Sequence, residues 1–106
     1  MAEKAPVVVE VLVESLEAEE DRALVAFVER IASQYEGVEV RIFTWSGPHE
    51  YPFSIGILDA YKMHACPAVV VNGFLVAAGE DPGEDELRAA IEKALRTGEF
   101  RVSRCV

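Results

Sequence analysis

The chain has 106 residues, of which 51% are hydrophobic and 27% charged, and nineteen acidic against ten basic side chains give a formal net charge of -9. This length and apolar content suit one domain over residues 1–106, with its core at about 6–96 and a C-terminal tail at 97–106. The acidity excludes general binding to nucleic acid or to anionic membrane surfaces. No export signal or membrane span is visible and two cysteines are too few for a disulfide scaffold, so we expect a cytoplasmic protein with no metal and no cofactor.

The first half of the chain predicts a strand, a helix and a second strand. Residues 6–13 are β-branched and almost continuously apolar, which is typical of a central strand buried on both faces. From about residue 17 to 35, apolar residues recur at three- and four-residue steps, which predicts an amphipathic helix that Gly37 ends. Residues 38–43 alternate between apolar and polar and predict a second strand. Strand, helix and strand in this order form a βαβ unit, so the two strands should pair in parallel.

The middle of the chain predicts an aromatic loop, a short helix and a hairpin. Two prolines and a glycine in residues 44–52 exclude regular structure there. Residues 53–63 carry an apolar face and predict a helix that Gly56 weakens. The apolar residues 68–77 are interrupted by Asn72-Gly73, a pair that supplies the two positive φ angles of a two-residue hairpin turn.

The last element is predicted to be a helix. Asp81 is the expected N-cap, with Pro82 at the first helical position and Glu84 three residues after the cap. Thr97-Gly98 ends the helix, and Phe100 and Val102 indicate an extra strand in the tail. The expected fold is therefore α/β, with the order βαβαββα and a central mixed four-stranded sheet.

The motif that points to a family begins at the proline before the hairpin and reads Pro67-Ala68-Val69-Val70-Val71-Asn72-Gly73, continued by Leu75-Val76-Ala77-Ala78-Gly79 and then by Pro82 and Glu84. With it the chain resembles the thioredoxin-like superfamily, in particular the small thioredoxin- and glutaredoxin-like proteins called small redox-active disulfide proteins. Together with Glu10-Val11-Leu12, the resemblance covers about residues 7–96. It implies a thioredoxin fold in which Pro67 is in the cis form and flanks the active site.

The chain departs from this family where the family's chemistry takes place. The resemblance implies a Cys-x-x-Cys pair at the start of the first helix, where the helix dipole lowers the pKa of the leading thiol. Counting without gaps from Glu10 puts that place at Leu16-Glu17-Ala18-Glu19, which holds no cysteine. The acidic residues from Glu17 to Asp21 would raise the pKa of a nearby thiol. Dithiol exchange cannot run from this helix.

Cys66, directly before Pro67, is the strongest candidate for thiol chemistry, and Cys105 could form a disulfide with it or with Cys105 of a second chain. Cys66 could act alone and form mixed disulfides with glutathione or a protein, or it could be a small, mostly buried apolar residue. His64 could lower the pKa of Cys66, or the two could join His49 and Cys105 around a soft metal. The His-x-Cys spacing is not diagnostic of a metal, and a histidine at a helix end is the simpler interpretation.

Glu10 is unusual because a charge in a buried central strand is costly unless it is paired. The resemblance implies a remnant of the buried carboxylate that moves protons in thioredoxins, six residues before the first active-site cysteine. A strand-end carboxylate with access to solvent, or one paired with Arg41, explains Glu10 equally well.

Two functions follow from these residues. The first is a binding module that holds a protein or an extended peptide at Ala65, Pro67 and Leu16 and at the aromatic loop of residues 45–53, which includes Trp45 and Tyr51. The loop's aromatic residues could instead cap the core. The second is a single-thiol oxidoreductase or redox sensor that acts through Cys66. We favour the first because both redox cysteines are missing. The tail, with Cys105, leaves open a monomer or a homodimer formed through it.

Overall fold

The computed structural model describes residues 7–45, 47 and 54–100. The elements, in chain order, are β1 (Val7–Val13), α1 (Glu19–Ala32), β2 (Val38–Thr44), α2 (Ile55–Lys62), β3 (Ala68–Val71), β4 (Phe74–Ala78) and α3 (Glu84–Thr97). The predicted order βαβαββα is confirmed, whereas the extra strand predicted around Val102 falls outside the described residues. No helix in the described ranges is long and apolar enough to cross a membrane.

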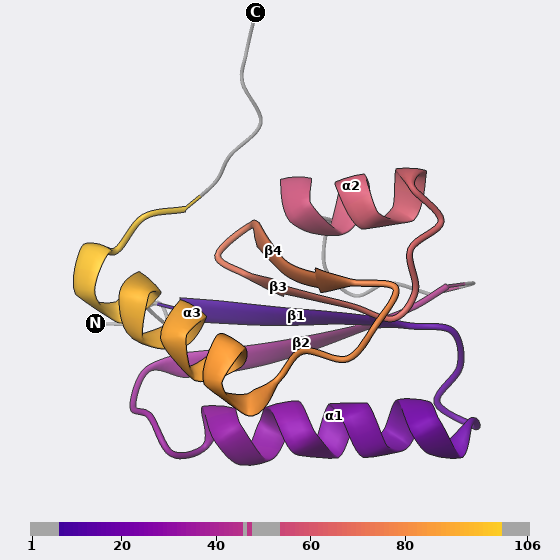
Figure 1. The fold of residues 1–106 in the computed structure, drawn as a ribbon, viewed down its shortest axis with the longest axis horizontal. Coiled ribbons are helices and arrows are strands. Elements are labelled where there is room, and N and C mark those ends of the chain that lie inside the picture. Colours follow the sequence, from indigo (N-terminus) through magenta and orange to yellow (C-terminus); the bar gives the residue numbers. More distant parts are fainter. Residues whose placement is uncertain (1–6, 46, 48–53, 101–106) are drawn as a thin grey trace, which may run out of the picture.

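The four strands form one mixed sheet in the order β2-β1-β3-β4 (Figure 1). β1 and β2 pair in parallel from Val7 opposite Val38 to Val13 opposite Thr44, as the βαβ pattern predicts. β3 is antiparallel to both β1 and β4. The fold is thus α/β with a mixed four-stranded sheet and three helices.

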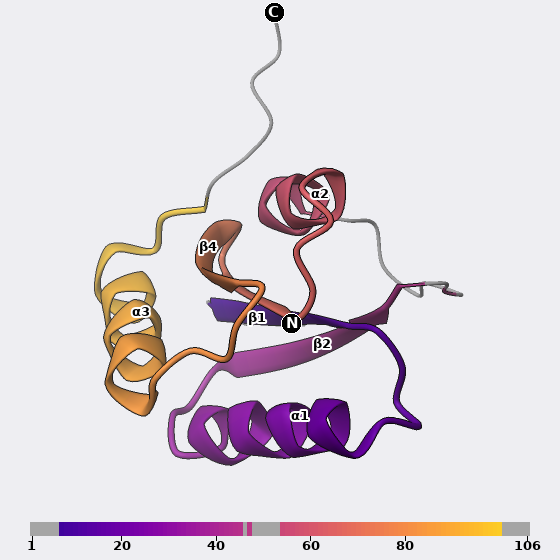
Figure 2. The ribbon, with the colours of Figure 1, turned by 45° about the vertical axis from the view of Figure 1, so that its right-hand side comes forward.

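The sheet is covered on both faces, with α1 and α3 on one side and α2 on the other (Figure 2). Alternate residues of β1 therefore meet different helices. On the side of α1 and α3 the core contains Val7, Val9, Val11, Val13, Leu24, Val28, Ile31, Leu87 and Ile91. On the side of α2 it contains Leu12, Phe43, Ile57, Ala60, Ala68 and Val70. The burial of β1 on both faces is the physical reason for its continuous apolar sequence.

The hairpin turn also connects distant parts of the chain. Asn72 and Gly73 have φ angles of 51° and 85°, as the Asn-Gly pair predicts. The Asn72 side chain is 1% exposed. Its Oδ1 accepts a hydrogen bond from Val8 N at 2.8 Å and its Nδ2 donates to Glu99 O at 3.1 Å. One turn residue thus joins β1 to the segment that follows α3, a role that the turn motif does not reveal.

The structure corrects the bounds of two helices. The predicted N-cap of α3 at Asp81 is wrong, because the helix begins at Glu84 with Gly83 as N-cap. Pro82 is buried before the helix starts and lines one pocket with Leu24 of α1. The Gly83 N–H then donates to Glu86 Oε1 at 2.9 Å, which is the backbone bond of a capping box placed two residues later than predicted.

α1 is shorter than the predicted span of 17–35. It starts at Glu19 because a closed loop precedes it, as described below, and it ends at Ala32. Gln34 N and Tyr35 N then donate to carbonyls three residues back, which tightens the chain into a last turn. Gly37, with a φ angle of 79°, completes the reversal into β2.

Candidate functional site

Several of the residues predicted to form a site lie at one end of the sheet, where β1 and β2 end and the chain enters β3 (Figure 1). We call this end the rim and define it as residues 14–18, Trp45 and Cys66-Pro67. Trp45 N donates to Val13 O at 2.9 Å. On the other side of β1, Cys66 Sγ lies 3.8 Å from Leu12 O. The rim therefore surrounds the carboxyl end of the central strand, where ligands of α/β sheets gather.

The backbone at the centre of the rim is exceptional in two ways. The Cys66-Pro67 peptide bond is cis, as predicted. The neighbouring backbone groups are paired, since Ala65 N donates to Ala60 O at 2.9 Å and Gly79 N donates to Pro67 O at 2.7 Å. Among the described residues, however, no backbone hydrogen bond involves Cys66 itself, because the ladder between β1 and β3 ends at Leu12 and Ala68. Within the described residues, the N–H and C=O of Cys66 thus have no backbone partner.

The Cys66 thiol is poorly suited to nucleophilic chemistry. It is half-buried, and burial raises its pKa from 9.0 to about 11, with further contributions from the charges of Asp21 and Glu14. A shift of this size leaves about a hundredfold less thiolate at neutral pH. The acidic start of α1 thus affects Cys66 in the direction that the sequence predicted, although burial is the larger cause.

The loop between β1 and α1 is closed by two side chains from the first turns of the helix. Asp21 Oδ2 accepts hydrogen bonds from Glu14 N at 3.1 Å and Ser15 N at 3.0 Å. Arg22 Nη1 donates to Leu16 O at 3.3 Å and to Glu17 O at 2.9 Å. Backbone groups of residues 14–17, which include the position of the expected redox pair, are therefore hydrogen-bonded to side chains of α1. Leu16 is left 45% exposed on the surface of the rim.

An aromatic cluster forms the side of the rim next to α2. The rings of Trp45 and Tyr61 stack with centroids 4.4 Å apart, and the Tyr61 hydroxyl donates to Trp45 O at 3.2 Å. His64 lies with its ring 5.8 Å from that of Trp45. His64 therefore contacts the aromatic cluster, and the charges that shift the pKa of Cys66 come from Asp21 and Glu14 instead. Tyr61 lies within residues 53–63, for which the sequence predicts an apolar helix face, and no local pattern places its ring against Trp45.

Other predicted residues are not placed. Tyr51, Phe53, His49 and Cys105 lie outside the described residues. Within the described ranges, no group of three or more His, Cys, Asp or Glu side chains is arranged to hold a metal ion.

Glu10 is buried, with 3% of its surface exposed, on the face of the sheet that α2 covers. It stands opposite Arg41 of β2 and receives hydrogen bonds from Ser54, the N-cap of α2. Burial raises its pKa above 4.5, while the bonds from Ser54 and the charge of Arg41 only partly oppose that shift. Of the alternatives for Glu10, access to solvent is wrong. The charge of Arg41 acts on Glu10, while the Arg41 guanidinium forms an ion pair with Glu39 at 2.7 Å.

Glu10→Gln is expected to stabilise the protein increasingly as the pH rises. Because the folded-state pKa of Glu10 is raised, its contribution to stability is fully present below pH 4.5 and is lost as the pH rises through the folded-state value. Glutamine keeps the neutral form at every pH. Urea unfolding at several pH values should show a growing advantage of Glu10→Gln over the wild type, and a much smaller change for the exposed control Glu29→Gln. An advantage that stays flat or falls with pH would contradict this account.

No protein-family model matches the chain, and no curated protein matches it significantly.

Proposed function

We propose that this chain is a thioredoxin-like domain without the redox pair, which binds an extended segment of a peptide or protein at the rim. The observation that carries the proposal is the backbone of Cys66, which has no backbone partner among the described residues and stands beside a cis proline. An extended peptide can bond to such a free N–H and C=O as a short added strand, and main-chain bonds of this kind supply affinity without requiring one particular sequence. The proposed site suits a cytoplasmic protein whose Cys66 stays reduced.

The side chains around Cys66 would select the partner. Trp45 and Tyr61 offer a stacked aromatic wall on one side, and exposed Leu16 offers an apolar contact on the other. Glu14 and Glu17 are exposed in the loop between these contacts and α1. Negative charge beside an apolar contact favours a segment that combines an apolar residue with a lysine or arginine.

The alternative, a single-thiol oxidoreductase that uses glutathione, is less well supported. The raised pKa of Cys66 suppresses the thiolate that would attack a disulfide. The acidic groups that contribute to that shift, Asp21 and Glu14, would also repel the carboxylates of glutathione.

The proposal is tested with an array of extended hexapeptides, probed with the full chain under reducing conditions. For the best-binding peptide, we expect amide shifts in a ¹⁵N spectrum to centre on Cys66, Leu16 and the Trp45 indole. Leu16→Ser should weaken binding by about tenfold, as expected for an apolar contact at the centre of an interface. Phe74→Ser, which changes an exposed residue of the hairpin, is the matched control and should leave the affinity unchanged.

Cys66→Ser separates the two functions. Binding through the backbone of residue 66 should persist in this variant, whereas a mixed disulfide cannot form. Loss of binding in Cys66→Ser, or peptide shifts confined to β4 and α3, would contradict the proposal.

A further inference from the structure

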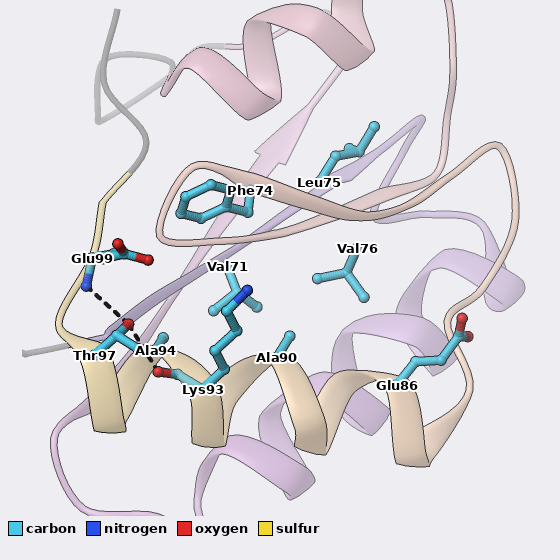
Figure 3. A pocket seen from close by; sticks show the side chains of 10 residues that line it. All are labelled: Val71, Phe74, Leu75, Val76, Glu86, Ala90, Lys93, Ala94, Thr97 and Glu99. Carbon is cyan, nitrogen blue, oxygen red and sulfur yellow. Dashed lines mark hydrogen bonds between the residues drawn. The ribbon is translucent and has the colours of Figure 1, made fainter.

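A groove of about 350 Å³ lies between β4 and α3, away from the rim (Figure 3). Phe74 and Val76 of β4 and Ala90 of α3 give it an apolar lining. Figure 3 shows Glu86 at one end of the groove and Glu99 at the other. Lys93 of α3 also lines the groove, and Figure 3 shows its side chain reaching across the middle toward Val71. The groove thus has an apolar lining crossed by one cation, with a carboxylate at each end.

One wall of the groove is the edge of the sheet. β4 is the last strand in the order β2-β1-β3-β4, and within the described residues it pairs only with β3. Its outer N–H and C=O groups are therefore available to a further strand, and an uncovered edge of this kind invites association between molecules. Phe74, at the start of β4, is 47% exposed.

The chain passes one end of this groove, where Glu99 lines it and Phe100 is 48% exposed. Gly98, with a φ angle of 69°, turns the chain back after α3. The bond from Asn72 Nδ2 to Glu99 O then holds it beside the hairpin, and Glu99 lines the groove. From Thr97 back to Glu86, α3 rises by about 16 Å, at 1.5 Å per residue. Five extended residues after Glu99 span about the same length, so residue 104 can reach the end where Glu86 lies.

When the segment after Glu99 runs toward Glu86, the character of its side chains is complementary to the lining of the groove. In an extended segment, Phe100, Val102 and Arg104 share one face, while Arg101 and Ser103 share the other. The first face places two apolar side chains along the apolar lining, beside the stem of Lys93, and a cation at Glu86. We propose that residues 100–104 bind in this groove as a fifth strand, parallel to β4 of the same chain, and so cover the edge of the sheet. This proposal is independent of the function proposed for the rim.

The test compares variants of the two faces of the segment in the full chain. In the wild type, we expect NOEs between the Val102 and Val76 methyl groups. Val102→Asp should remove the Val76 contact and speed hydrogen exchange at the outer amides of β4 by at least about tenfold. Ser103→Asp makes a similar change in charge on the opposite face and should leave exchange within about twofold of the wild type. Arg104→Glu and Arg101→Glu form a second pair, in which the first should speed exchange and the second should not.

Sedimentation at several protein concentrations distinguishes binding of the segment in the groove of its own chain from binding in the groove of a second copy. We expect the wild type to stay monomeric while β4 is protected, and Val102→Asp to associate more readily. Protection that appears only in a dimer would overturn the proposal in favour of exchange between two copies. Equal exchange in Val102→Asp and Ser103→Asp, or no NOE to Val76, would also overturn it.

Discussion

Gly56→Ala is expected to destabilise the protein by about 3 kcal/mol, although alanine is the better helix former. A Cβ at this position would lie 2.6 Å from Gly73 O and 2.6 Å from Val70 Cγ1. Neither contact is with the free end of a flexible side chain, so α2 would have to move away from the hairpin. Helix propensity alone predicts the opposite sign, a gain of about 1 kcal/mol.

Urea unfolding of Gly56→Ala checks this prediction. The matched control is Gly83→Ala, whose Cβ would meet the flexible side chain of Glu86 at 3.3 Å. This N-cap substitution should cost less than about 1 kcal/mol. A Gly56→Ala protein as stable as the wild type would show that α2 does not pack on the hairpin as described.

Asn72→Ala is expected to cost a similar amount, about 3 kcal/mol, from two causes. The side chain satisfies the half-buried Val8 N–H at 2.8 Å, and leaving such a donor unpaired costs about 1–3 kcal/mol. The φ angle of 51° adds about 1 kcal/mol for a residue with a Cβ other than asparagine or aspartate.

Asn72→Gly separates these two causes, since glycine removes the hydrogen bonds but accepts the positive φ angle. We expect it to be about 1 kcal/mol more stable than Asn72→Ala in urea unfolding and still less stable than the wild type. If both variants have the same free energy of unfolding as the wild type, the side-chain hydrogen bonds of Asn72 contribute nothing to stability.

The elements of the fold are largely predictable from the sequence, because their signals are local. The continuous apolar run of β1, the periodicity of α1 and the Asn-Gly turn each depend on neighbours in the chain. The start of α3 is not predictable in this way, because Pro82 is buried opposite α1 and the proximity of distant elements leaves no local pattern. The close approach of Gly56 to the hairpin has no local signal for the same reason.

The site was predictable in part. The acidic residues near the start of α1 predict a raised thiol pKa, and the family resemblance implies the cis bond before Pro67. That Cys66 has no backbone partner among the described residues is not predictable, since it depends on where the ladder between β1 and β3 stops. The stacking of Trp45 on Tyr61 likewise arises only when α2 folds over the end of β2.

Cys66 is expected to act through its backbone N–H and C=O and not as a nucleophile. The pH dependence of Cys66 alkylation by iodoacetamide in a Cys105→Ser protein tests this expectation. The account predicts a pKa near 11 and, at pH 7, a rate about a hundredfold below that of an unperturbed thiol. A pKa well below 9.0, together with turnover in a glutathione-coupled disulfide assay, would contradict it.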